Sequence, residues 1–328
     1  MNQASARIAP GRKTIFGTCV LLLVTLPPDV YAQQGFPVKP IRILTGTAGG
    51  SSDIAARVIA QALGALFGQQ VIVDARPNVL AREIVIKSPP DGYNLLLAAN
   101  SFYLGPLLRD DAQYDPLRDF SPVTLAIRGP NIIVVHPSLP TRSIKELIAL
   151  AKSRPGVLNY ASGASGASTH LGPELFKAMA AVNIARIPYK GGAQALGDMV
   201  GGQVQMMFVN PSPGMPYIKA GRLRALAITA AQSSALFPAL PTVAAAGLPG
   251  FEHSAKVGIY APANMPAAIV QRLNDGLVKV LNSADVKDKF LDLGIETVGS
   301  SPEQLAAAMK SEMTRMAKVI KDAGIREE

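Results

Sequence analysis

Apolar residues recur at steps of three and four positions over 54–67, and a β-branched run precedes them at 41–45. The first pattern is typical of a helix with one buried face, and the second is typical of a strand. The connection at 46–50 contains three glycines, Ser51-Ser52-Asp53 follows it, and Gly68 is a natural helix end. The pattern therefore predicts a strand, a glycine-rich loop and an amphipathic helix in succession.

The start of this predicted helix is a candidate anion site. The first N–H groups of a helix have no partner inside the helix, and they carry a partial positive charge. Glycines before them let a ligand approach without meeting a Cβ. In the alternative interpretation, Ser51, Ser52 or Asp53 only caps the helix. Asp53 could instead recognise an amino or hydroxyl group of a ligand, and one carboxylate can do both.

Strand, loop and helix patterns alternate along the rest of the chain. Further strands are expected at 71–74, 94–99, 131–135, 158–161, 185–189, 205–209, 223–229 and 257–260. Further helices are expected at 80–87, 143–153, 169–179, 193–200, 215–220, 241–246, 266–281, 284–293 and 302–321. A surface connection is expected at 114–120. This alternation predicts parallel sheets with helices on both faces.

A second unit of strand, glycine- and serine-rich loop and helix occurs at 158–180. Two such units in separate lobes would direct two helix starts at one cleft, which is the architecture of a ligand clamp. Ser162, Ser168 and Thr169 supply hydrogen-bond donors in this second loop. Bonding within the turn itself is the alternative role for these hydroxyls.

The first 32 residues have the pattern of a signal peptide. Three basic residues precede the apolar run 14–26, which is too short to span a membrane, and Val30-Tyr31-Ala32 resembles a cleavage site. We therefore expect export, with cleavage near Ala32. The only cysteine, Cys19, lies in this segment. The mature chain can consequently form no disulfide, thiolate zinc site or cysteine nucleophile.

Composition narrows the remaining classes of protein. A length of 328 residues is enough for two α/β lobes, and 5% aromatic residues without tryptophan favour helices packed on strands over an all-β sandwich. The net charge is +9, but the basic residues are scattered and do not interleave with aromatic residues as a nucleic-acid groove requires. We expect a solvated basic surface and no nucleic-acid partner.

Catalytic and metal chemistry have little support in the sequence. His170 lies among serines, but a Gly-x-Ser-x-Gly motif is absent and no orienting acid has a suggestive spacing. His136, His170 and His253 lack the spacing of metal ligands. The segment 189–192 is not a complete phosphate loop, and Lys190 is either a solvated charge at the cleft edge or a ligand contact. We expect no catalytic residue, no metal and no cofactor.

Several segments together resemble one known family. They read KPIRIL, AGGSSDIAAR, PPDGYNLL, YDPLRDFSPV, YASGASGASTHLGPELFK, IPYKGGAQALGDMVGGQVQMMF, IKAGRLRALAIT and LPTVAAAGLPGFE. In this order, over about 36–328, they are similar to the tripartite tricarboxylate transporter receptors. These receptors are the Bug or TctC-like extracytoplasmic solute-binding proteins.

The resemblance implies a periplasmic binding protein with a two-lobed, type II-like α/β fold. Each lobe would be a mostly parallel sheet flanked by helices, and two crossing strands would join the lobes. Together with the signal peptide at 1–32, we expect lobe 1 at 36–137 and 258–328, lobe 2 at 138–257, and hinges near 136–138 and 256–260.

The resemblance also implies where a ligand binds. Backbone N–H groups and hydroxyls of two loops, which match 48–53 and 162–170, would hold a carboxylate. The implied ligand-binding residues are Ala48, Gly49, Gly50, Ser51, Ser52, Asp53, Ser101, Phe102, Ser162, Gly163, Gly166, Ser168, Thr169, His170, Tyr189, Lys190, Gly191 and Asn210. The first loop is one residue shorter than the usual pattern, and the glycine-rich stretch after Pro77 is reduced to 78–80. Lys256 stands where many members have tryptophan. The resemblance therefore does not identify the ligand.

We expect a non-enzymatic receptor that captures a small carboxylate between its lobes and delivers it to membrane transporter subunits of the tripartite tricarboxylate type. The alternative is a periplasmic sensing protein that presents bound carboxylate to a membrane histidine kinase. A hydrolase built on Ser162 and His170 is a third hypothesis. We expect the chain to act as a monomer.

Overall fold

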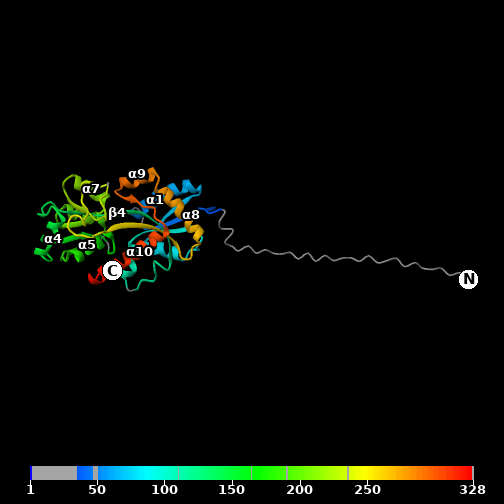
Figure 1. Cartoon of the computed structure of the whole chain (residues 1–328), viewed down its shortest axis with the longest axis horizontal. Helices are drawn as coiled ribbons and strands as arrows, with labels where there is room; N and C mark the ends of the chain where they lie inside the picture. Colours follow the sequence, from blue (N-terminus) through cyan, green and yellow to red (C-terminus); the bar gives the residue numbers. More distant parts are fainter. Residues whose placement is uncertain are drawn as a thin grey trace.

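The computed structural model describes residues 1, 35–46, 51–109, 111–163, 165–189, 191–234 and 236–326. Apart from Met1, the predicted signal peptide and its cleavage site lie outside these residues, as does most of the loop 46–50. The described residues form two α/β lobes, each built on its own sheet (Figure 1). The two-lobed α/β fold predicted from the sequence is therefore confirmed.

The first lobe contains a six-stranded mixed sheet. In spatial order its strands are β11 (Glu296–Thr297), β4 (Phe120–Pro130), β10 (Ser254–Pro262), β3 (Asn94–Ala99), β1 (Ile41–Thr45) and β2 (Val71–Ala75). β1 runs parallel to β2 and β3, whereas β10 runs antiparallel to β3 and β4. The sheet is mixed rather than mostly parallel because β10, which returns from the other lobe, runs antiparallel to β3 and β4, and β11 runs antiparallel to β4.

Helices cover both faces of this sheet. They are α1 (Ser51–Phe67), α2 (Asn78–Ile86), α3 (Ser101–Leu108), α8 (Ala267–Leu281), α9 (Ala284–Asp292) and α10 (Pro302–Asp322). α1 packs on α8 and α9, whereas α10 packs on α3 and β4. None of the helices in the described ranges combines the length and the apolar character that a bilayer span requires.

The second lobe contains a five-stranded mixed sheet. In spatial order its strands are β7 (Ala185–Pro188), β6 (Asn159–Ser162), β8 (Met206–Val209), β5 (Ile132–Val135) and β9 (Arg224–Ile228). Its helices are α4 (Ile144–Ser153), α5 (Ser168–Ala180), α6 (Gly192–Val200) and α7 (Pro211–Lys219). β5 runs antiparallel to both of its neighbours, and the other pairs are parallel.

The chain passes between the lobes at two adjacent points. β4 ends in the first sheet at Pro130, and β5 begins in the second sheet at Ile132. At the return, the His253 N–H donates to the Thr229 carbonyl oxygen, and the Thr229 N–H donates to the Asn131 carbonyl oxygen, both at 2.9 Å. Through Thr229, these hydrogen bonds join the segment that enters the second lobe at Asn131 to the segment that leaves it at His253.

The strand pairing differs from the predicted lobe boundaries. The prediction assigned residues up to 137 to the first lobe and residues up to 257 to the second. However, β5 pairs within the second sheet, and all of β10 pairs within the first. β5 is buried at every position, and an apolar run of this kind does not reveal which sheet will accept it.

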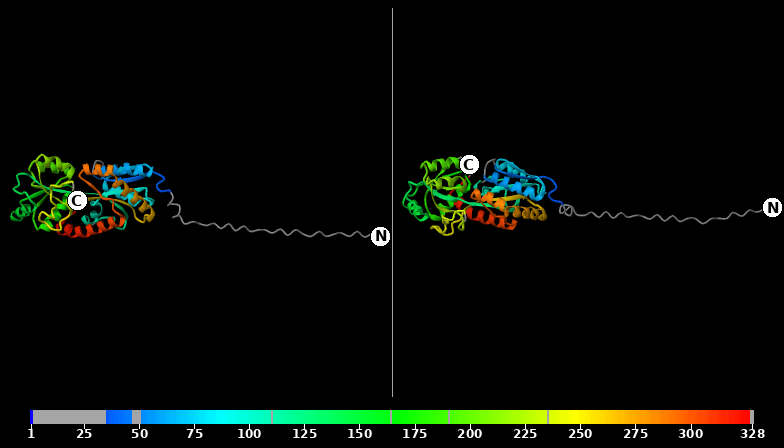
Figure 2. Two further views of the ribbon diagram at one scale, coloured as in Figure 1. Left: turned by 45° about the horizontal axis from the view of Figure 1, so that its top comes forward. Right: turned by 90° about the horizontal axis from the view of Figure 1, so that it is seen from above.

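One apolar core continues from the first lobe into the second. It includes Tyr103 and Met316 on the side of the first sheet, and Phe176 and Phe208 in the second lobe. α10 contributes to this continuity, because it contacts α5 as well as α3. Figures 1 and 2 show α10 beside the junction of the lobes.

Two elements were missed by the sequence prediction, and one predicted helix was wrong. The helix α3 was not predicted, because Gly105 and Pro106 interrupt its pattern. The long strand β4 was not predicted, because it contains two prolines and a glycine near its ends. The helix expected at 241–246 is a turn, in which the Ala246 N–H donates to the Thr242 carbonyl oxygen and Thr242 forms a bridge with Ile228.

Candidate ligand-binding site

A cavity of about 500 Å³ lies between the two lobes, and both lobes contribute to its walls. Among the described residues, five helices begin at it: α1, α2 and α3 from the first lobe, and α5 and α7 from the second. Each provides a polar lining residue from its first turn. These residues are Ser52, Asn78, Ser101, Ser168 and Ser212.

The helix starts that line the cavity favour the binding of an anion there. Each start directs backbone N–H groups and the positive end of a helix dipole toward the same space. Among the described lining residues, Arg128 is the only charged one, and its guanidinium is paired with Glu296 at 3.1 Å. The positive potential therefore comes mainly from backbone groups, with the hydroxyls of serines and the side-chain amides of Asn78, Asn100 and Asn210 beside them.

Local sequence explains how two of these helices begin at the cavity. In α7, Pro211 occupies the first turn, where its missing N–H costs nothing, and Asn210 precedes it in an extended conformation. The Asn210 side-chain oxygen accepts a hydrogen bond from Asn131 Nδ2 at 2.8 Å. In α2, the start comes close to the first loop, because a Cβ on Gly46 would lie only 2.7 Å from Asn78 Oδ1.

The start of α3 is held by buried polar contacts. The Asn100 N–H donates to the Lys256 carbonyl oxygen at 2.8 Å, and the Asn100 Nδ2 donates to Glu312 Oε1 at 2.9 Å. Asn100 is itself 3% exposed. These contacts fix the position of Ser101 at the cavity wall.

The structure brings four of the predicted residues together at this cavity. They are Ser52, Ser101, Ser168 and Asn210. Phe102 instead lines a neighbouring cavity within the first lobe. Asp53 is buried away from the described lining, and its carboxylate is paired with Arg57 at 3.0 Å.

Most predicted residues of the second loop do not line the described cavity. They form hydrogen bonds that hold the loop in its conformation. Ser162 is fully buried, and its hydroxyl accepts from Arg186 Nε at 2.8 Å and donates to the Gly163 carbonyl oxygen. The Gly163 N–H donates to Thr169 Oγ1 at 3.2 Å. These bonds hold the loop in place, so that Ser168 at the start of α5 faces the cavity.

His170 belongs to the same supporting network. Its Nδ1 accepts a hydrogen bond from the Gly166 N–H at 3.2 Å. Burial, and then the nearby charges of Arg186 and Lys177, lower the pKa of His170 to about 4. The imidazole is therefore neutral near pH 7 and is a weak proton acceptor. Neither His170 nor Gly166 lines the described cavity.

The remaining predicted residues either lie elsewhere in the structure or fall outside the described residues. Neither Tyr189 nor Gly191 lines the described cavity. The Tyr189 hydroxyl donates to Asp198 Oδ2 at 2.8 Å, and Gly191 directly precedes α6. Ser51 begins α1. Outside the described residues lie Ala48, Gly49, Gly50 and Lys190. Within the described residues, no group of acidic, histidine or cysteine side chains could hold a metal ion.

Sequence reasoning missed several parts of the wall. Asn78 and Ser212 each lie beside a proline at a helix start, and that signal could have found them. Arg128 lies in the unpredicted strand β4. The apolar residues Phe290, Leu293 and Ile295 reach the cavity from the end of α9, and no local pattern distinguishes them from ordinary core residues.

Two lobes around a cavity ringed by helix starts define a solute-binding protein. A sequence model described as the tripartite tricarboxylate transporter family receptor matches residues 55–325. The chain belongs to this family, which confirms the resemblance found in the sequence. The family consists of receptors rather than enzymes.

Individual relatives agree with this assignment. Protein BugT of Bordetella pertussis is 35% identical over 295 residues, which cover 88% of this chain and 90% of BugT. A protein of R. palustris solved with adipate has 35% identity and a TM-score of 0.77, over 89% of this chain and 100% of its own. MatC from Rhodopseudomonas palustris, solved with malate, has 28% identity and a TM-score of 0.73, over 87% and 100%.

Proposed function

We propose that this protein is an exported receptor that closes its two lobes on a small carboxylate and delivers it to membrane subunits of a tripartite tricarboxylate-type transporter. The observation that carries the proposal is the convergence of five described helix starts on one interlobe cavity. Solved relatives that hold adipate and malate support a carboxylate as the ligand.

The contacts between the lobes suggest how binding and closure are coupled. Ser234 of the second lobe donates to Glu296 Oε1 of the first at 3.0 Å. Glu296 also pairs with Arg128, which lines the cavity. Closure therefore removes water from the ligand and at the same time forms contacts beside it. Bonds from helix starts to a carboxylate strengthen as water leaves, because the local dielectric falls.

Delivery follows from closure, because the membrane subunits can recognise the closed shape and open it. Export is proposed from the N-terminal pattern. Export is tested by measuring the mass of the protein recovered from the periplasm. This mass should match a chain that begins after Ala32. Loss of ligand uptake in cells that lack this protein tests the role in transport, whereas loss of a transcriptional response alone would favour sensing.

Carboxylate binding is tested by adding a negative charge at a helix start. Ser168→Asp places a carboxylate in the first turn of α5, where an acidic residue is compatible with the helix dipole. Folding should survive, but affinity for carboxylates should fall at least about tenfold through like-charge repulsion. A screen of mono-, di- and tricarboxylates by thermal shift identifies the ligand, since saturation at a hundred times Kd adds about 2.7 kcal/mol of stability.

The matched control is Ser143→Asp. Ser143 caps α4, away from the described cavity lining, and its hydroxyl accepts from the Glu146 N–H at 3.2 Å, which aspartate can also do. This variant should bind as the unmodified protein does. If Ser168→Asp binds equally well, the interlobe cavity is not the carboxylate site.

A further inference from the structure

A second cavity, of about 370 Å³, opens beside the interlobe cavity and lies within the first lobe. The two cavities share lining residues, namely Gly46, Ser52, Asn78, Ala99 and Ser101. The starts of α1, α2 and α3 therefore lie at the boundary between the two spaces. A ligand held at these helix starts can extend into the side cavity.

Arg82 of α2 supplies a positive charge to the side cavity. Its guanidinium carbon lies 3.8 Å from the centroid of the Tyr114 ring, and its side chain is half-buried. In the part of the chain that the structure describes, this guanidinium has the ring contact but neither an ion pair nor a hydrogen bond. Three other charged residues in the described lining have partners of opposite charge. Arg109 pairs with Asp111 at 3.1 Å, and Glu83 lies 4.0 Å from Lys87. Arg82 is thus a cation with its N–H groups available to a ligand.

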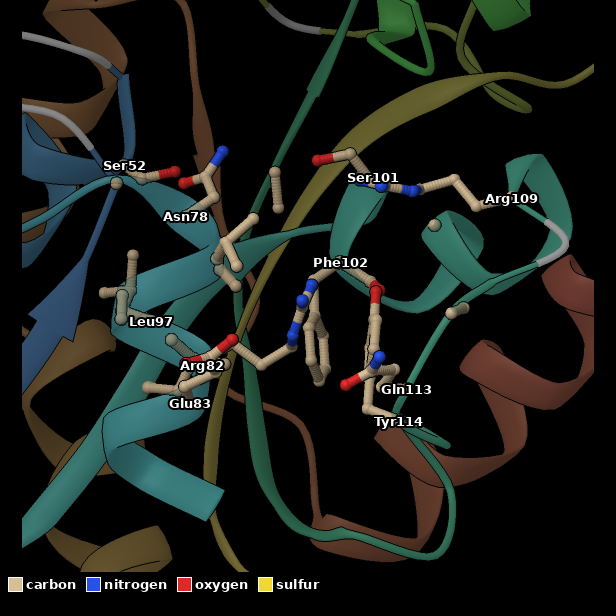
Figure 3. A pocket seen from close by; sticks show the side chains of 18 of the residues that line it. Ser52, Asn78, Arg82, Glu83, Leu97, Ser101, Phe102, Arg109, Gln113 and Tyr114 are labelled. Carbon is tan, nitrogen blue, oxygen red and sulfur yellow. The ribbon is translucent and has the colours of Figure 1, made fainter. Parts of the chain in front are cut away.

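The surroundings of Arg82 orient it for recognition. The Tyr114 hydroxyl donates to the Phe102 carbonyl oxygen, which fixes the ring against which the guanidinium stacks. Stacking leaves the edge of a guanidinium open to bind an anion. Figure 3 shows the side chains of Asn78, Ser101 and Arg82 around one space, with the ring of Phe102 beside it.

We infer that the side cavity is a second subsite, in which Arg82 binds an anionic group at the far end of an elongated ligand. For a dicarboxylate such as the adipate or malate that solved relatives hold, the first carboxylate then lies at the helix starts and the second at Arg82. This inference rests on the proposed function, because it assumes that the first carboxylate binds in the interlobe cavity. It adds the position and the chemistry of the second end.

Matched acids test this subsite on the mature protein by calorimetry. The diacids succinate, adipate and suberate are compared with butyrate, hexanoate and octanoate. At least one diacid should bind about tenfold or more tightly than the monoacid of equal length, since a charge-assisted hydrogen bond is gained. Arg82→Gln should remove this advantage and leave the affinity for the monoacid unchanged. The unchanged monoacid affinity also shows that the variant is folded.

A charge reversal makes the test sharper. Arg82→Glu should bind the preferred diacid even more weakly, and it should gain affinity for the amino acid of equal length that carries an ammonium at its far end. The control Lys279→Gln removes an exposed charge from the C-terminal end of α8 in the same lobe, and Lys279 does not line the side cavity. This variant should keep the preference for diacids.

The failures of the two proposals are distinguishable. If no acid of either series binds the unmodified protein, the proposed function is wrong and the inference falls with it. If acids bind but diacids have no advantage, or if Arg82→Gln weakens both series equally, the inference is wrong and the proposed function stands.

Discussion

The ammonium nitrogen of Lys256 lies 2.8 Å from Oε2 of Glu312, and the Glu312 side chain is only 2% exposed. This ion pair joins the strand β10, where the chain returns to the first lobe, to the C-terminal helix α10. Glu312 also accepts hydrogen bonds from Asn100 and from the Tyr103 hydroxyl. The pair thereby supports the start of α3, which carries Ser101 to the cavity wall.

Replacing Glu312 should destabilise the first lobe. Burial raises the pKa of Glu312, but the Lys256 ammonium and the hydrogen bonds from Asn100 and Tyr103 lower it more, so the carboxylate stays charged. Glu312→Gln leaves the mostly buried Lys256 ammonium without a counter-charge, which should cost about 3 kcal/mol of unfolding free energy. Urea denaturation at neutral pH measures this loss. Lys310→Gln, at an exposed position of α10, should cost less than about 0.5 kcal/mol.

Stability should fall as the pH falls through the range of the buried histidines. Burial lowers the pKa of His170 from 6.5 to about 4. Between these values the unfolded chain binds a proton that the folded chain does not, so the stability from neutral His170 is complete above pH 6.5 and decreases toward pH 4. His253 is buried, and its pKa is also lowered to about 4, so it acts in the same range.

His170→Asn should reduce this pH dependence. Asparagine can still accept a hydrogen bond from the Gly166 N–H, but it does not titrate. Urea unfolding at pH 7 and pH 5 should show a smaller difference in the variant, by on the order of 1–2 kcal/mol. An equal difference in both proteins would show that folding does not lower the pKa of His170.

A methyl group at Gly294 should hinder closure of the lobes. A Cβ at this position would lie 2.7 Å from Cβ of Pro211, which begins α7 in the opposite lobe. Gly294 also has a φ of +71°, so alanine adds strain of about 1–2 kcal/mol within the first lobe. Gly294→Ala should therefore lose stability and, in addition, bind its ligand several-fold more weakly.

Gly221→Ala separates these two effects. Gly221 has a φ of +68°, and a Cβ there would meet nothing within 4 Å. This variant should lose similar stability and keep the ligand affinity of the unmodified protein, as measured by calorimetry. If both variants bind alike, contact between Gly294 and Pro211 does not control closure.

Much of the fold was predictable from local patterns. The helix α1 could be predicted from the spacing of its apolar residues. The two strand–loop–helix units also predicted that the start of α1 and the start of α5 belong to one site. Both contribute to the cavity through Ser52 and Ser168. The helix expected at 143–153 is also present as α4, and Ser143 caps it by accepting a hydrogen bond from the Glu146 N–H. These features depend on residues within a turn or two of each other.

Tertiary structure alone decided which polar residues face the cavity. Ser162 and Ser168 lie in one loop, yet Arg186 from the neighbouring strand β7 binds the first and leaves the second at the wall. Arg82 and Tyr114 stack, although 114–120 was expected to be an exposed connection. Such outcomes depend on contacts between distant segments, which a local pattern does not encode. Helix starts could thus be inferred from the order of residues, but their convergence on one cavity required the packed sheets.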